Sequence, residues 1–155
     1  MLQQFVTDRT LHARSGTAFA VTPTLREAYA EGDDDELADV ALREAALASL
    51  RLLAGEGASR MPPRRAVVEA EVGDVTVRPD LDDAVVRLAG PIDFGDVIAA
   101  YVDIADAEAA VLQAIDAVDA ADLGEEDAEF VVGDAQDHDL AWYAPQELPF
   151  LLELL

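Results

Sequence analysis

Apolar residues recur every three to four positions in several parts of the chain, which is the spacing of a buried helix face. The pattern is clearest in 106–121, where Val111 and Val118 are expected to face a core and Asp116 the solvent. Ile104, just before this segment, is expected to face the same core. The predicted helices span residues 1–11, 23–32, 33–54, 106–121 and 146–155.

Two of these helices have recognisable starts. Thr22 is a favourable N-cap residue, and Pro23 suits the first helical position because no N–H is needed there. The acids at 33–35 suit the positive end of the next helix dipole. These residues predict one helix that begins after Thr22 and another that begins at the three aspartates.

The apolar spacing changes to two from residue 68 onward. Val68 and Ala70 alternate with Glu69 and Glu71, as in a strand with one buried face. Residues 94–97 are expected to form a single helical turn. The predicted strands span residues 17–21, 68–72, 75–77, 84–88, 98–102, 129–132 and 140–143.

This order of helices and short strands predicts an α+β fold. We expect two layers, with one small mixed or antiparallel sheet covered by helices on one face. A chain of 155 residues is long enough for one domain with its own core. We therefore predict a single domain over 1–155, with a flexible connection at 55–63, where two Gly, two Pro and a Ser occur.

Charge is distributed very unevenly along the chain. The first 87 residues hold 16 acids and all 10 arginines, whereas the last 68 hold 17 acids and no Lys or Arg. The two parts carry net charges of about −6 and −17, which together give −23. Such a charge repels nucleic acid and anionic lipid, and it attracts basic proteins or divalent cations.

Composition and missing motifs exclude several kinds of chemistry. The chain has no Cys, so disulfides, thiol catalysis and thiolate metal sites are ruled out. It has no glycine-rich nucleotide loop, no H-E-x-x-H and no G-x-S-x-G motif. No apolar run approaches the ~18 residues of a membrane span, so we expect a cytoplasmic, soluble protein without direct nucleic-acid or membrane binding.

Asp134, Asp137, His138 and Asp139 form the densest group of candidate metal ligands. Hard oxygen ligands favour Mg²⁺ or Ca²⁺, and His138 could serve as a base. The spacing does not match an EF-hand loop, because position 6 from Asp134 is Asp139 rather than Gly. The simpler interpretation is a solvated acidic turn before a strand, with no cofactor bound.

Trp142 and Tyr143, followed by Gln146 and Glu147, form a candidate recognition edge. An aromatic pair at a strand end can anchor a partner. Strand neighbours point to opposite faces, so one aromatic ring should be buried and the other exposed. The alternative is that Trp142 is a core residue and Tyr143 is merely half-exposed.

Two further segments carry open alternatives. The Leu-rich tail at 150–155 either packs back onto the core or forms an exposed patch that mediates a homodimer. Arg60, Arg64 and Arg65 form a basic cluster that could bind an anion. In a chain this acidic we expect them to pair with its own carboxylates.

Residues 127–130 and 133–149 resemble a small actinobacterial family of unknown function. Its acidic members share a D-H-x-L-x-W-Y-A-P-Q-E-L type motif near the C-terminus, and residues 20–29 and 75–80 are similar to it too. The resemblance implies no catalytic or binding residue. It does imply a further short strand ahead of the first helix, so the chain is expected to start inside that helix.

These features favour a non-catalytic interaction module for a basic protein partner. One alternative is a divalent-cation-binding module or small metal-dependent enzyme centred on the 134–139 turn. Another is a structural subunit that forms homo-oligomers through the C-terminus. No catalytic residue is assigned, and the sequence favours a protein that is not an enzyme.

Overall fold

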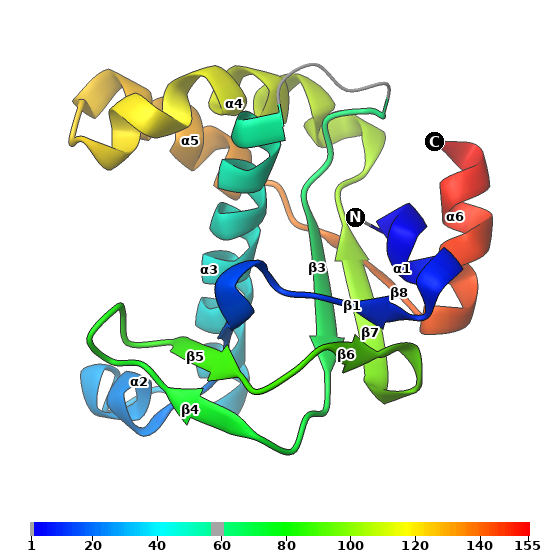
Figure 1. Cartoon of the computed structure of the whole chain (residues 1–155). Coiled ribbons are helices and arrows are strands. Elements are labelled where there is room, and N and C mark those ends of the chain that lie inside the picture. Colours follow the sequence, from blue (N-terminus) through cyan, green and yellow to red (C-terminus); the bar gives the residue numbers. More distant parts are fainter. Residues whose placement is uncertain (1, 57–60) are drawn as a thin grey trace. The chain divides into compact units, whose positions relative to one another are not determined.

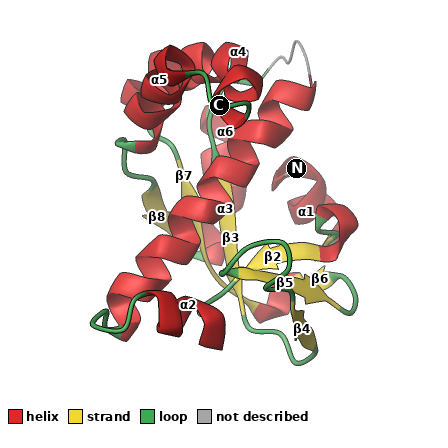
Figure 2. Cartoon of the chain, turned by 90° about the vertical axis from the view of Figure 1, so that its left-hand side faces the viewer, coloured by secondary structure: helices red, strands yellow, loops and turns green. Residues whose placement is uncertain are grey.

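The computed structural model describes residues 2–56 and 61–155, which fold into two compact units (Figures 1 and 2). The first unit comprises residues 1–45 and 70–98, and the second comprises residues 46–69 and 99–155. Helix α3 and strands β3 and β7 contribute residues to both units. The α+β fold class is therefore confirmed.

The helices are α1 (Leu2–Asp8), α2 (Pro23–Ala28), α3 (Asp34–Glu56), α4 (Glu108–Asp122), α5 (Glu126–Gln136) and α6 (Leu148–Leu154). The strands are β1 (Thr10–Leu11), β2 (Thr17–Phe19), β3 (Ala66–Ala70), β4 (Val75–Val77), β5 (Val85–Leu88), β6 (Ile92–Asp93), β7 (Val97–Val102) and β8 (Ala141–Tyr143).

Two small sheets shape the first unit. β1 pairs antiparallel with β6, and β5 lies between β2 and β4, antiparallel to both. Leu25 of α2, Leu37 of α3 and Ala84 are buried together beside these strands. Aliphatic packing thus joins the two helices to the strand that starts at Val85.

Helix α2 begins at the predicted cap. The Thr22 hydroxyl accepts a hydrogen bond from the Leu25 N–H at 3.0 Å and donates one to the Asp83 carbonyl oxygen. Thr22 is buried, and so is its bond with the Leu25 N–H, whereas the bond to Asp83 is partly buried. The cap therefore links the start of α2 to the residues that precede β5.

The second unit combines one sheet with a helical hairpin. β7 is the central strand between β3 and β8, and β8 runs antiparallel to it. Helices α4 and α5 run side by side in opposite directions (Figures 1 and 2). The core consists of small and aliphatic side chains: Leu50, Ala107, Val111, Ala114, Val118, Val132 and Ala135.

Most predicted elements are present, with four corrections. The first helix ends at Asp8, and Thr10–Leu11 form strand β1 instead of continuing the predicted helix. Residues 129–132 belong to α5 and not to a strand, because Ala128, Val132 and Ala135 are buried at helical spacing. Ile104 is exposed rather than part of the core. Among the described residues the strands form three small sheets instead of one.

The predicted connection at 55–63 is tested only in part. Helix α3 continues through Glu56, two residues beyond the predicted end. Residues 57–60 lie outside the described part of the chain. The described residues form two compact units, and the assignment of a single domain over 1–155 stays a prediction.

Candidate functional site

The α4–α5 hairpin carries a dense array of exposed carboxylates. No Lys or Arg occurs anywhere between Leu88 and the last residue, Leu155. The exposed acids of the hairpin are Asp116, Asp119, Asp122, Glu125, Glu126, Asp127, Glu129, Asp134 and Asp137. This surface therefore has a strongly negative local potential.

The described arginines of the second unit are all paired with carboxylates of the same unit. Arg51 forms a two-pronged contact with Asp122, at 3.0 and 2.9 Å. Arg64 lies 3.6 Å from a carboxylate oxygen of Glu108. Arg65 pairs with Asp103, so the expectation is confirmed for Arg64 and Arg65, whereas Arg60 lies outside the described residues.

Arg65 and Asp103 form an ion pair in the interior. Their side chains are 1% and 0% exposed, and Arg65 Nη2 lies 2.7 Å from Asp103 Oδ1. Asp103 Oδ2 also accepts from the Arg65 backbone N–H at 2.7 Å and from Nε at 2.9 Å. The carboxylate is thus well supplied with donors, as a buried charge requires.

The same guanidinium holds the segment that contains His138. Arg65 Nη1 donates to Gln136 Oε1 at 2.8 Å, and Nη2 donates to the His138 carbonyl oxygen at 2.8 Å. These bonds fasten the end of α5 and the following turn to the start of β3. The 134–139 segment therefore has a structural role, through the Gln136 side chain and the His138 backbone.

The four candidate metal ligands are distributed over that segment. Asp134 lies within α5, Asp137 is the C-cap residue, and His138 and Asp139 follow in a turn. In residues 2–56 and 61–155 no three His, Asp or Glu side chains gather in a way that could hold a metal ion. Cation binding at this turn stays a prediction.

Trp142 lies on an edge strand and faces solvent. Its side chain is 58% exposed, so its interpretation as a core residue is wrong, and Tyr143 is half-buried. Trp142 pairs in register with Tyr101 of β7, whose hydroxyl donates to Glu69 at 2.8 Å. Trp142 therefore lies beside a tyrosine whose hydroxyl is held by a carboxylate of β3.

Gln146 and Glu147 follow Trp142 in a turn of 3₁₀ helix, Pro145–Glu147. Glu147 Oε1 accepts the Ala144 N–H at 3.0 Å, so this side chain caps the turn. Gln146 is exposed. Of the predicted recognition residues, Trp142 and Gln146 are thus the most available to a partner.

The C-terminal helix has one buried and one exposed side. Leu148 and Leu151 are buried, whereas Phe150 and Leu154 face solvent. The tail therefore packs back in part and also leaves an apolar surface. Each of the two alternatives therefore describes one side of this helix: the buried side packs onto the core, and the exposed side is available to a second copy.

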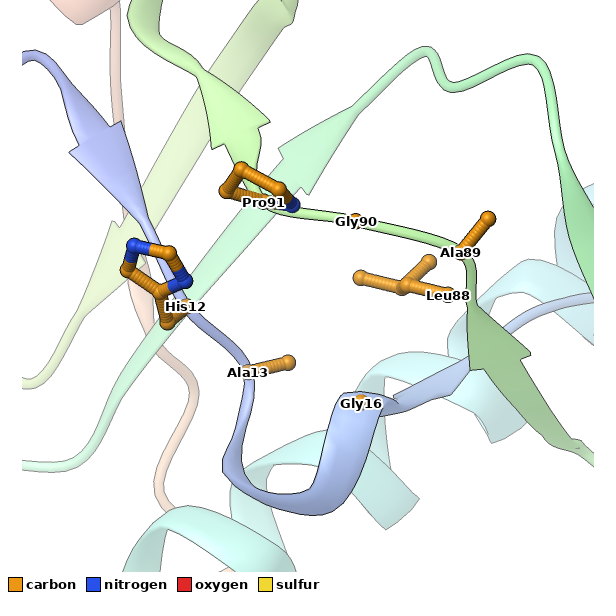
Figure 3. A pocket seen from close by; sticks show the side chains of 7 residues that line it. All are labelled: His12, Ala13, Gly16, Leu88, Ala89, Gly90 and Pro91. Atoms are coloured by element: carbon orange, nitrogen blue, oxygen red, sulfur yellow. The ribbon is translucent and has the colours of Figure 1, made fainter.

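An open pocket of ≈ 200 Å³ lies between the His12–Gly16 segment and the Leu88–Pro91 turn of the first unit (Figure 3). The lining consists of His12 and six small or apolar residues. No nucleophile or carboxylate is among these described lining residues, so His12 has no catalytic partner there.

Three exposed apolar residues of the hairpin were not singled out from the sequence, and Leu112 of α4 is one of them, at 57% exposed. Leu123 is 90% exposed in the turn after α4, and Phe130 is 67% exposed on α5. Because a strand was predicted at 129–132, Phe130 was not identified as an exposed residue of a helix. The useful pattern was Ala128, Val132 and Ala135 at helical spacing, which places Phe130 opposite the buried face.

In the part of the chain that the structure describes, no helix combines the length and apolar character needed to cross a bilayer.

Residues 1–152 of the chain match the sequence pattern of a known family. It is a family of unknown function (DUF6912). No curated protein and no solved structure shows significant similarity to the chain.

Proposed function

The chain belongs to the DUF6912 family of unknown function, and we propose that it acts as a non-catalytic interaction module for a basic protein partner. The proposal includes a cytoplasmic location. That the family is actinobacterial and marked by the motif at 137–148 remains a prediction.

The observation that carries this proposal is the uncompensated charge of the second unit. Its described arginines form ion pairs with Asp103, Glu108 and Asp122. The other exposed acids of α4 and α5 have no arginine in their own segment to neutralise them. Arginine and lysine side chains of a partner would supply the missing positive charge.

The same charge argues against other classes of partner. Phosphate backbones and anionic lipid headgroups are repelled by a surface of this sign. Trp142 adds an exposed aromatic side chain, and Trp is enriched among residues that dominate binding energy. The favoured partner is therefore a protein with a basic surface that can also receive an aromatic ring.

The test is affinity capture from the source cell's lysate with the full chain as bait. Bound proteins are eluted with rising salt and identified, and an acidic protein of similar size and net charge serves as the control bait. We expect a basic protein that the control does not retain and that salt releases. Trp142→Ser should retain less of it.

Two results would contradict the proposal. The first is a bait that retains nothing beyond the control at low salt. The second is a partner whose retention does not change with salt, because an interaction between exposed charges is screened at high ionic strength.

The exposed side of α6 favours a second candidate, a homo-oligomeric subunit. Phe150 and Leu154 are available to a second copy. Analytical ultracentrifugation of the full chain should then show a dimer that Phe150→Ser converts to monomer. A strict monomer in the unsubstituted protein would rule this candidate out.

Cation binding at the 134–139 turn is tested separately. If the turn binds a cation, calorimetric titration with Mg²⁺, Ca²⁺ or Mn²⁺ would show heat that disappears when Asp137 and Asp139 are changed to Asn. Flat titrations with all three ions would end this alternative.

A further inference from the structure

The turn between α4 and α5 holds a large apolar side chain in solvent. Gly124 has φ of 90°, its N–H donates to the Ala121 carbonyl at 2.9 Å, and the Glu125 N–H donates to the Ala120 carbonyl at 3.1 Å. This is a closed helix end that glycine accommodates without strain. Backbone hydrogen bonds therefore fix the place of the neighbouring Leu123.

A second apolar side chain is exposed on α5, seven residues after Leu123 and next to acidic residues in the sequence. Phe130 follows one turn after Glu126, and both are exposed. We call this surface the hairpin tip. It consists of the exposed residues Leu123, Glu125, Glu126, Asp127, Glu129 and Phe130.

Helix stability explains only part of this surface. Glu126, Asp127 and Glu129 lie in the first turn of α5, where negative charge interacts favourably with the helix dipole. That interaction gives no reason for Leu123 and Phe130 to remain in water. Exposed apolar groups rimmed by polar ones are typical of interaction sites.

We infer that the hairpin tip is the docking surface for a basic amphipathic segment, one that carries apolar side chains between its Lys and Arg residues. Leu123 and Phe130 would contact the apolar side chains, and the four surrounding acids would face the cations. The inference rests on the proposed function and adds the surface and the chemistry of the segment.

Charge complementarity selects this occupant over the hairpin tip of a second copy of the chain. The last 68 residues hold no Lys or Arg, so a second hairpin tip would bring like charges together. Like charges placed opposite each other oppose association. A cationic segment would instead place positive charge opposite the acids of the hairpin tip.

Two labelled peptides of equal length and charge serve as probes of the full chain. One is an amphipathic helix of Lys and Leu, and in the other Ser replaces each Leu. Fluorescence anisotropy gives Kd for both peptides. We expect the Lys/Leu peptide to bind more tightly, and Phe130→Ser to remove most of that preference.

A matched pair of charge variants locates the binding. The tip variant carries Glu125→Gln, Glu126→Gln and Glu129→Gln. The control variant removes three exposed acids from the start of α3 by Asp35→Asn, Glu36→Gln and Asp39→Asn. We expect the tip variant to weaken Lys/Leu binding by about tenfold and the control by less than about twofold.

The outcomes separate this inference from the proposed function. Equal weakening by the two variants, or an unchanged peptide preference in Phe130→Ser, would overturn docking at the hairpin tip and leave the proposed function standing. If the unsubstituted chain binds neither peptide, both fail. Circular dichroism should show native helix content in every variant, because each replaced side chain is exposed.

Discussion

At the scale of single residues, the buried Arg65–Asp103 pair has the largest predicted effect on stability. It joins the start of β3 to the end of β7, and through Gln136 and His138 it holds the end of α5. Because both charges are out of water, each depends on the other for compensation.

Asp103→Ala should therefore lower the free energy of unfolding by about 3–5 kcal/mol, since it leaves Arg65 buried without its partner. Chemical denaturation measures the change. Asp122→Ala, which breaks the exposed pair with Arg51, is the control and should cost at most about 1 kcal/mol. Equal losses of unfolding free energy in the two variants would contradict a larger contribution from the buried pair.

A second prediction concerns the pKa of Asp80. The Arg78 guanidinium donates hydrogen bonds to this carboxylate at 2.9 and 2.7 Å, and it lowers the pKa of Asp80 below its ordinary value. A lowered folded-state pKa means that the pair's contribution is complete above the unfolded pKa. It is lost only as the pH falls through the folded pKa.

Arg78→Gln should accordingly raise the pKa of Asp80 toward its ordinary value. Carbon NMR of the carboxyl group, followed through an acid titration, measures that midpoint. An unchanged midpoint would contradict the assignment of the shift to Arg78.

The sequence predicted the pairing of Arg64 and Arg65 with carboxylates but not their partners. With 33 acids in the chain, spacing alone cannot select Asp103, which is 38 residues from Arg65. Nor could it decide whether Trp142 is buried. That depends on β8 lying at the edge of its sheet, which is a tertiary property.

At the scale of elements, local patterns located most helices because their caps and buried faces are encoded within a few residues. Thr22 and Pro23 are an example, and the aspartates at the start of α3 are another. The error at 129–132 arose because a short apolar run fits a strand or a helix equally well. Longer spacing, from Ala128 to Ala135, identifies the helix.

The Thr22 cap gives a prediction at this scale. Thr22→Ala should destabilise the protein by about 1–2 kcal/mol, because the buried Leu25 N–H and the partly buried Asp83 carbonyl both lose their partner. Thr22→Ser, which keeps the hydroxyl, should recover most of this loss. Thermal unfolding of the two variants measures it, and equal melting temperatures would contradict the capping role.

At the scale of the whole molecule, the charge asymmetry was readable from composition, whereas its compensation was not. The sequence shows that cations end at Arg87, but only the contacts show that Arg51, Arg64 and Arg65 are already engaged. The net charge available to a partner follows from these internal pairs. That availability is the central claim about function.

The most direct test is the affinity of the captured basic partner for the full chain, measured by titration calorimetry at low and at high salt. The account predicts that affinity falls by at least about tenfold between about 50 and 500 mM salt, because screening shortens the reach of exposed charges. An affinity that is the same at both salt concentrations would contradict it.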